Sequence, residues 1–249
     1  MLGWSAIPTD RFRAIAVVVA VTVAAFGLGS GALALLSRAI ADRGIPSASA
    51  RPVLVLANFV VLQGLAFGAV TAAYIAVRGA GRGFLRLRRP TARHVVLVFV
   101  GSGLLLALAI VVGLLSILLG VDPARNRVAE FGGEAPWLFV VLVPISFLLI
   151  GPGEELLFRG VVQRRLRESF SAPPAIVLAS ALFAGPHVFA LTGGSAGVTL
   201  AVLFGLGLIL GWFYEWSDNL VVPILMHGTY NALLFALLYV RIRAGAGLG

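Results

Sequence analysis

The chain contains 249 residues, of which 60% are hydrophobic and 12% charged, and its mean hydropathy is +1.03. Soluble domains carry about twice this share of charged residues, so the composition excludes a soluble globular protein and indicates a polytopic membrane protein with an all-α fold. All 19 basic residues are Arg, and the net charge is +9. Because the Arg residues lie between apolar runs, they indicate membrane topology and no nucleic-acid partner. The absence of Cys excludes disulfides, thiolate nucleophiles and Cys-based metal sites.

Seven apolar runs are long enough to cross a hydrocarbon core, which takes about 20 helical residues. The expected spans cover residues 14–36, 52–77, 94–119, 137–164, 173–190, 198–216 and 220–240. No small-residue cleavage site follows the first run before a polar segment, so we expect that run to be retained as a span. The sequence therefore predicts a single integral membrane domain over residues 1–249, a transmembrane helical bundle of about seven spans in the cell membrane.

Polar and helix-breaking residues interrupt three of the spans. We expect Asn58 and Gln63 in the second span to form hydrogen bonds between helices. His94 at the edge of the third span has no polar neighbour at helical spacing, and we expect it to be an interfacial residue rather than a ligand. In the fourth span, Pro144 and the Gly-Pro-Gly sequence at residues 151–153 predict a kink or a break.

The Arg residues are distributed unequally over the two sides of the predicted bundle. The side of the N-terminus and of the loop at residues 78–93 holds 11 Arg, the other side holds 7, and Arg159 lies within a span. Cytoplasmic loops of membrane proteins carry the excess of basic residues. We therefore expect the N-terminus, the loop at residues 78–93 and the mouth of the active site to face the cytoplasm.

The fourth span carries two carboxylates and a guanidinium in otherwise apolar sequence. An unpaired charge at this depth costs on the order of 3 kcal/mol even on a lenient insertion scale. In a helix, Glu155 and Arg159 are four residues apart and can pair, whereas Glu154 is rotated by about 100° toward a different neighbour. A structural alternative is that both acids are favoured by the dipole of a helix that begins after Gly-Pro-Gly. Because Glu154 lies inside a predicted span, a catalytic role is favoured over the structural one.

Two further patterns place polar groups on one helical face. Phe183 and His187 in the fifth span, and His227 and Asn231 in the seventh, are four residues apart. With a rise of about 1.5 Å per residue, Glu154 and these polar residues lie about 10 to 20 Å from the edge that the Arg residues mark. One cavity can therefore combine a base, an imidazole and donors for an oxyanion.

Together, the three motifs resemble those of the CPBP family, which contains the CAAX prenyl proteases and the bacteriocin-processing, or ABI, proteins. The resemblance is carried by Glu-Glu-x-x-x-Arg at residues 154–159, Phe-x-x-x-His at 183–187 and His-x-x-x-Asn at 227–231. It implies an intramembrane glutamate endopeptidase whose all-helical core covers residues 137–240, in the last four spans. Residues 1–136 would then form accessory spans.

The resemblance also implies a role for each motif residue and a class of substrate. Glu154 would activate water with His187 as its partner, and His227 with Asn231 would stabilise the oxyanion. The supporting residues would be Glu155, Arg159 and Phe183. The substrate would be a peptide or protein, anchored in the membrane, and no cofactor or metal is implied.

Two other interpretations remain open. A carboxylate and two imidazoles suit catalytic zinc, so Glu154, His187 and His227 form an alternative ligand set, although the His-Glu-x-x-His sequence is absent. Because Asn231 is a poor zinc ligand and a good amide donor, we expect no tightly bound metal. The last alternative is a membrane immunity or scaffold protein, or a transporter, without catalytic activity. Two related halves, which many transporters have, are not visible in the sequence.

Overall fold

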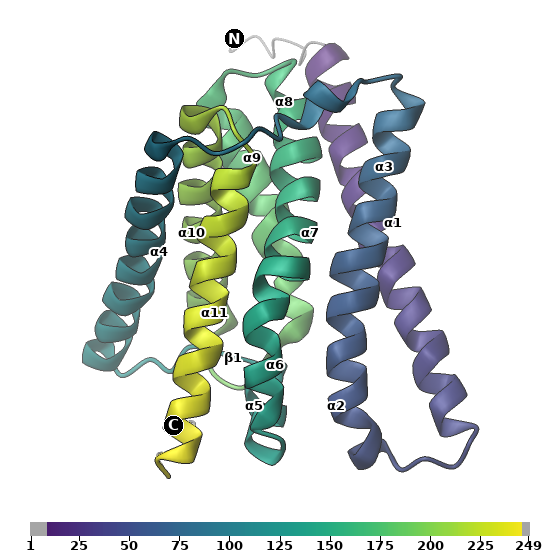
Figure 1. The fold of residues 1–249 in the computed structure, drawn as a ribbon, viewed down its shortest axis with the longest axis vertical. Helices are drawn as coiled ribbons and strands as arrows, with labels where there is room; N and C mark the ends of the chain where they lie inside the picture. Colours follow the sequence, from purple (N-terminus) through teal and green to yellow (C-terminus); the bar gives the residue numbers. More distant parts are fainter. Residues whose placement is uncertain (1–8, 246–249) are drawn as a thin grey trace, which may run out of the picture.

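The computed structural model describes residues 9–245, and this part of the chain contains seven helices that are long and apolar enough to cross a membrane (Figure 1). They cover Asp10–Ala41, Ser47–Val77, Ala92–Leu119, Trp137–Arg167, Ala172–Ala190, Ala196–Ser217 and Val221–Arg243. The predicted all-α bundle is therefore confirmed, and each predicted span lies within one residue of an observed span or inside it. The prediction for the N-terminus falls partly on residues 1–8, which lie outside the described residues.

Three of the spans change helix type along their length. The second span consists of α2 (Ser47–Asn58), the π-helical turns η1 (Phe59–Ala66) and α3 (Phe67–Val77). The fourth consists of α6 (Trp137–Ile145), η3 (Ser146–Ile150), α7 (Gly151–Glu155), η4 (Leu156–Gln163) and α8 (Arg164–Arg167), of which η3 and η4 are π-helical. The fifth consists of α9 (Ala172–Ala184) and the 3₁₀-helix η5 (Gly185–Ala190).

The remaining elements are regular helices and short pieces in the loops. The other four spans are α1 (Thr9–Ala41), α4 (Ala92–Leu119), α10 (Ala196–Ser217) and α11 (Val221–Arg243). The loops contain the 3₁₀-helix η2 (Arg82–Leu85), the helix α5 (Arg127–Glu134) and the strands β1 (Arg125–Asn126) and β2 (Leu191–Thr192). The two strands form an antiparallel pair that joins the loop before α5 to the end of η5.

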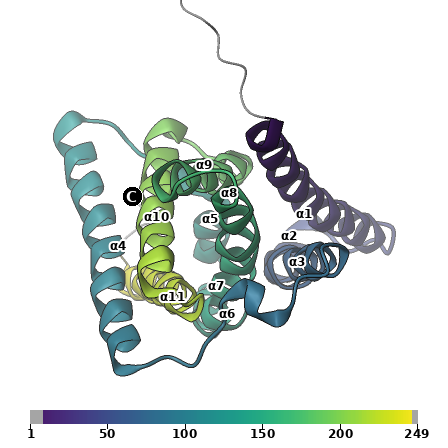
Figure 2. The ribbon, with the colours of Figure 1, turned by 90° about the horizontal axis from the view of Figure 1, so that it is seen from above.

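The fourth span lies near the middle of the bundle. Seen from above (Figure 2), α4 and α1 lie at opposite edges, and the fourth span lies between α10 and α11 on one side and α1 to α3 on the other. Leu157, Phe158 and Val162 are fully buried in a core that also contains residues of α1, α3 and α9. A second core joins α4, α10 and α11. Protein rather than lipid therefore surrounds the acidic stretch.

Of the kink or break predicted in the fourth span, the break is not observed, because the helix is continuous. The helix continues through Pro144 and Gly151 with two π-helical segments, a local adjustment that lets backbone groups near Pro and Gly find new partners. The glycines instead permit close packing. A Cβ on Gly151 would lie 2.7 Å from the Ile224 carbonyl oxygen of α11, and a Cβ on Gly153 would overlap the Gln63 carbonyl of η1. Consequently, α7 touches α11 on one side and η1 on the other.

Contacts between the loops define two faces of the bundle. On one face, Arg78 after the second span pairs with Glu168 after the fourth at 2.7 Å. On the opposite face, Arg51 pairs with Glu134 at 3.2 Å, and β1 pairs with β2. The first described residues lie on the former face and the end of α11 lies on the latter (Figure 1). We call them the Arg78 face and the Arg51 face.

His94 lies on the Arg78 face in the first turn of α4, and it has polar neighbours that the sequence pattern does not reveal. Its Nδ1 accepts a hydrogen bond from the Thr91 backbone N–H at 3.1 Å, as part of a capping box. Its Nε2 lies 3.2 Å from the Ser217 carbonyl oxygen. One of these partners, Thr91, lies just before the helix, and the other, Ser217, is distant in sequence, so spacing within the span does not reveal either contact.

We expect the Arg78 face to be cytoplasmic, because it carries the excess of Arg. The Cys-free chain allows single cysteines to be introduced at Arg89 and Arg125, which are exposed on the Arg78 face and the Arg51 face respectively. With a membrane-impermeant maleimide on intact cells, Arg125→Cys is expected to react at once and Arg89→Cys only after permeabilisation. The reverse pattern would overturn the orientation.

Candidate active site

The two acids of α7 face different neighbours, as the helical spacing predicts. Glu155 is fully buried, and its Oε1 lies 2.9 Å from Arg159 Nη1 and 2.8 Å from His227 Nδ1. The predicted ion pair within the helix is therefore present. His227, from α11, is a third member of this group that helical spacing does not predict. Because Glu155 is paired with a guanidinium, it accepts hydrogen bonds, and His227 Nδ1 donates to it.

Arg159 is enclosed by protein on every side. Its exposed fraction is 1%, and its Nη2 donates a second hydrogen bond to the Gly207 carbonyl at 3.0 Å. The guanidinium carbon lies 4.8 Å from the centre of the Phe183 ring, a distance at which a cation is attracted to the ring face. The same ring packs against the imidazoles of His187 and His227, at 5.1 and 5.8 Å between ring centres. Phe183 thus packs against the buried cation and against both imidazoles.

Glu154 lies between α11 and the second span. Its Oε1 accepts a hydrogen bond of 2.7 Å from Gln63 Nε2, and its Oε2 lies 3.8 Å from His227 Nε2. Only 5% of the residue is exposed, yet it lines a cavity of about 810 Å³. Among the acids of the fourth span, Glu154 is therefore the one that a water or a substrate can reach.

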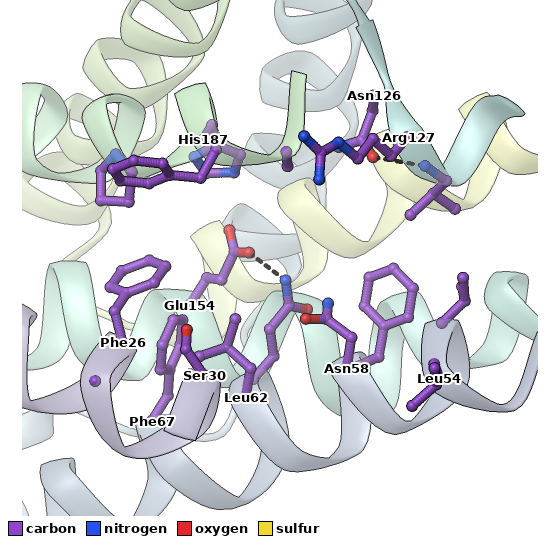
Figure 3. A pocket seen from close by; sticks show the side chains of 18 of the residues that line it. Phe26, Ser30, Leu54, Asn58, Leu62, Phe67, Asn126, Arg127, Glu154 and His187 are labelled. Carbon is purple, nitrogen blue, oxygen red and sulfur yellow. Dashed lines mark hydrogen bonds between the residues drawn. The ribbon is translucent and has the colours of Figure 1, made fainter. Parts of the chain in front are cut away.

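The cavity runs between the first two spans and η5, and most of its lining is apolar. Its two walls are visible in Figure 3, with Phe26, Leu62 and Asn58 on one wall and His187, Asn126 and Arg127 on the other. The Glu154 carboxylate points into the space between them. The end of the cavity that lies away from Glu154 is lined by Arg51, Asn126 and Arg127.

This position corrects the expectation that the mouth of the site shares a face with the loop at residues 78–93. The polar end of the cavity lies on the Arg51 face instead. On the Arg78 face, the loop at residues 78–93 is joined to the turn between α10 and α11, because the Leu220 backbone N–H donates to the Arg86 carbonyl and Asn219 Nδ2 donates to the Arg88 carbonyl. The number of Arg residues reports the orientation of loops and carries no information on the side to which a cavity opens.

The predicted partner of Glu154, His187, lies across the cavity rather than against the carboxylate. His187 Nδ1 lies 2.8 Å from the Phe183 carbonyl oxygen, which can only accept, so Nδ1 carries the hydrogen. Within the described residues, the imidazole that comes nearest to Glu154 in a polar contact is that of His227. Sequence spacing gave no means of choosing between the two imidazoles.

Asn231 lies one turn beyond His227 on α11 and is half-buried. It does not line the cavity, and its side chain makes no hydrogen bond to the described residues. The structure therefore brings five of the seven predicted residues into one cluster, places His187 across the cavity and leaves Asn231 outside this set of contacts. The part assigned to Asn231 stays a prediction.

Gln63 was expected only to join helices, and its contact with Glu154 was missed. It belongs to η1, in the part of the chain assigned to accessory spans, and it has no motif around it. One signal could have identified it, since an amide in an otherwise apolar span must find a polar partner. Asn58, in the same span, also lines the cavity.

A zinc ion would require the Glu154, His187 and His227 ligand atoms to converge. The described residues contain no group of three or more His, Cys, Asp and Glu side chains arranged to hold a metal. The contact of Glu155 with His227 Nδ1 does resemble the carboxylate contact that orients metal-bound histidines. In the observed arrangement, however, the alternative set does not fit a three-ligand zinc site, because His187 lies on the opposite wall.

Comparison with known proteins agrees with the motifs. Residues 136–233 match the family model described as type II CAAX prenyl endopeptidase Rce1-like. The uncharacterized protein YpbD of Bacillus subtilis is 34% identical over 86 residues, which are 34% of this chain and 40% of the relative. The chain thus spans less than half the length of the curated relative it matches. No solved structure matches.

The matched segment contains all three motifs, so residues 136–233 are similar to the Rce1-like CAAX prenyl endopeptidases. The resemblance that the motifs carry is therefore confirmed. Gln63 lies outside the matched segment, and nothing in the comparison assigns it a role.

Proposed function

We propose that this protein is an intramembrane endopeptidase in which Glu154 activates the water that hydrolyses a peptide bond. The observation that carries the proposal is the position of Glu154, whose carboxylate lies within the bundle and also lines a cavity. A general base must reach both water and substrate, and an ionisable residue inside a span is by default functional. The match of residues 136–233 to the Rce1-like endopeptidase family model supports peptide hydrolysis as the reaction.

In this proposal, Glu154 acts first as base and then as acid. It takes one proton from water while the water oxygen bonds to the carbonyl carbon, which gives a tetrahedral oxyanion. Glu154 then passes the proton to the amide nitrogen, and the carbon–nitrogen bond breaks. His187, on the opposite wall, is the proposed partner that relays this same proton from Glu154 to the amide nitrogen through Nε2, since its Nδ1 is engaged by the Phe183 carbonyl.

His227 is proposed as a donor to the oxyanion. The contact of its Nδ1 with Glu155 fixes the imidazole, and its Nε2 points toward Glu154 at 3.8 Å. In the protonated ring, Nε2 donates to a negative oxygen that forms beside Glu154, and the two nearby carboxylates compensate the positive charge. Asn231 keeps its predicted part as a second donor in this proposal.

The shape and lining of the cavity support an apolar, extended and membrane-anchored substrate. The cavity follows the second span from Gln63 to Arg51, about 18 Å at 1.5 Å per residue. An extended peptide of roughly five residues covers this length at about 3.3 Å per residue. The description of the family names prenylated CAAX peptides, and the apolar walls suit a hydrocarbon chain.

The test is hydrolysis by the purified full chain in lipid nanodiscs. Prenylated CAAX peptides and their unmodified forms are incubated in water enriched in ¹⁸O, and the products are identified by mass spectrometry. The wild type is expected to release a peptide with one ¹⁸O in its new carboxyl group, whereas Glu154→Ala gives no product. Equal cleavage by both proteins would overturn the assignment of Glu154. Peptide binding without cleavage by the folded wild type would favour the scaffold alternative.

We also propose that activity requires no tightly bound metal. General-base catalysis by Glu154 activates water without a Lewis acid, and His187 and His227 lie on different sides of the carboxylate. Metal analysis of the active protein is expected to find less than one zinc per chain, with turnover retained after chelation. One zinc per chain, lost with activity on chelation and restored with it, would favour the zinc alternative.

A further inference from the structure

Gln63 is half-buried, and its side chain contacts the proposed base within the wall of the cavity. The hydrogen bond from its Nε2 to Glu154 Oε1 measures 2.7 Å and is the dashed line at the Glu154 carboxylate in Figure 3. The bond connects η1 to α7, between spans that lie far apart in the sequence. A charge-assisted hydrogen bond of this length fixes the orientation of the carboxylate.

The backbone around Gln63 is built for this contact. Gly153, next to Glu154, has no side chain, and a Cβ there would overlap the Gln63 carbonyl. One residue after Gln63, a Cβ on Gly64 would lie 3.1 Å from the Leu149 side chain. Close approach on both helices therefore sets the position of the amide. The segment is also π-helical, a geometry that is frequent at functional sites.

The other half of the amide has no protein partner. Since carboxylate oxygens only accept, the atom that faces Glu154 must be Nε2, and Oε1 is the acceptor. Gln63 Oε1 is buried and receives no hydrogen bond from the described residues, while the side chain lines the cavity. A buried acceptor left without a donor costs about 1–3 kcal/mol. Gln163 Oε1 also lacks a donor among the described residues, but Gln163 does not line the cavity, so of these two amides only Gln63 can hold a water that a substrate reaches.

We propose that Gln63 is a further catalytic residue that orients the attacking water; this inference rests on the proposed function. Nε2 holds Glu154, and Oε1 accepts one hydrogen of the water whose other hydrogen points to Glu154. The water oxygen then directs a lone pair at the substrate carbonyl. As the carbon–oxygen bond forms, Glu154 takes the first proton, and the second stays on the oxygen. Gln63 is unchanged through the cycle.

The kinetic test compares Gln63→Leu with a matched control in the same span. Thr71 on α3 is also buried and has a hydroxyl without a partner among the described residues, but it does not line the cavity. Gln63→Leu is expected to lower kcat about 10- to 100-fold with KM within about twofold, because orientation of the reacting atoms acts on the transition state. Thr71→Val is expected to change kcat by less than about twofold.

Gln63→Glu keeps the size of the side chain but places a second carboxyl group against Glu154. Two carboxylates at this distance cannot both stay ionised, so they share a proton and Glu154 is a poorer base, and kcat is expected to fall at least as far as in Gln63→Leu. Thermal unfolding of each variant in the same nanodiscs reports stability independently of turnover. A Gln63→Leu protein that is as active as Thr71→Val, or that loses activity only through KM, would overturn the inference.

An experimental structure at high resolution provides a readout that does not depend on activity. Water is expected within hydrogen-bond distance of both Gln63 Oε1 and the Glu154 carboxylate. A protein donor on Oε1 in place of water would overturn the inference even if the wild type cleaves peptides. An inactive wild type with this water in place would refute the proposed peptidase function and leave the water site standing.

Discussion

Replacement of Glu154 by Gln is expected to lower kcat by about 10²- to 10⁴-fold, the usual contribution of a positioned general base. The amide has nearly the shape of the carboxylate, and its oxygen can still accept the hydrogen bond from Gln63 Nε2. What it cannot do is take a proton from water. The variant should therefore fold and bind substrate like the wild type while turnover is lost, and single-turnover kinetics with a cleavable peptide measures the effect.

A surface acid gives the matched control for this change. Glu168 lies on the Arg78 face, where it pairs with Arg78 and Arg165, and it does not line the cavity. Glu168→Gln removes the same charge at an exposed ion pair, which typically contributes about 0–1 kcal/mol, so kcat should stay near the wild-type value. If Glu154→Gln kept more than a tenth of wild-type kcat, the base would have to be sought elsewhere.

The spans could be predicted from sequence because lipid imposes a simple rule. Each backbone group must be satisfied within its own helix, so an apolar run of sufficient length marks a span. Of the kink or break predicted at Gly151 and Gly153, the break does not occur, for a reason that lies outside the helix itself. The Ile224 and Gln63 carbonyls of neighbouring helices lie so close to these positions that a Cβ atom would not fit there. Such tertiary contacts leave no local pattern in the sequence.

In the candidate site, too, local contacts could be predicted from the sequence and contacts between helices could not. The pairing of Glu155 with Arg159 follows from their spacing of four residues on one helix, so this contact is local. The approach of His227 to both acids depends on how α11 packs against α7, which no spacing encodes. The contact of Gln63 with Glu154 could not be predicted, because the second span carries no motif. Only the presence of a polar amide in an apolar run indicated that Gln63 has a polar partner.

Glu155→Ala is expected to destabilise the fold far more than Glu154→Ala. Removal of one partner from a buried ion pair typically costs about 3–5 kcal/mol, because the remaining charge is left without compensation. Here the remaining charge is Arg159, which is 1% exposed, and His227 Nδ1 loses its acceptor as well. Glu154→Ala removes a single hydrogen bond beside a cavity that water can enter, for which about 1–3 kcal/mol is expected.

Unfolding in the same detergent, followed by Trp fluorescence, compares the two alanine variants directly. Glu155→Gln serves as the control, since it keeps an oxygen that accepts from Arg159 and from His227 but loses the charge, and it should fall between the wild type and Glu155→Ala.

The double variant Glu155→Leu with Arg159→Leu tests the mechanism itself. Replacing both partners of a buried pair with apolar residues is often nearly neutral, so this protein should be more stable than Glu155→Ala. If the double variant were the least stable of the series, the guanidinium would contribute mainly through its contacts with Gly207 and Phe183 rather than through the ion pair.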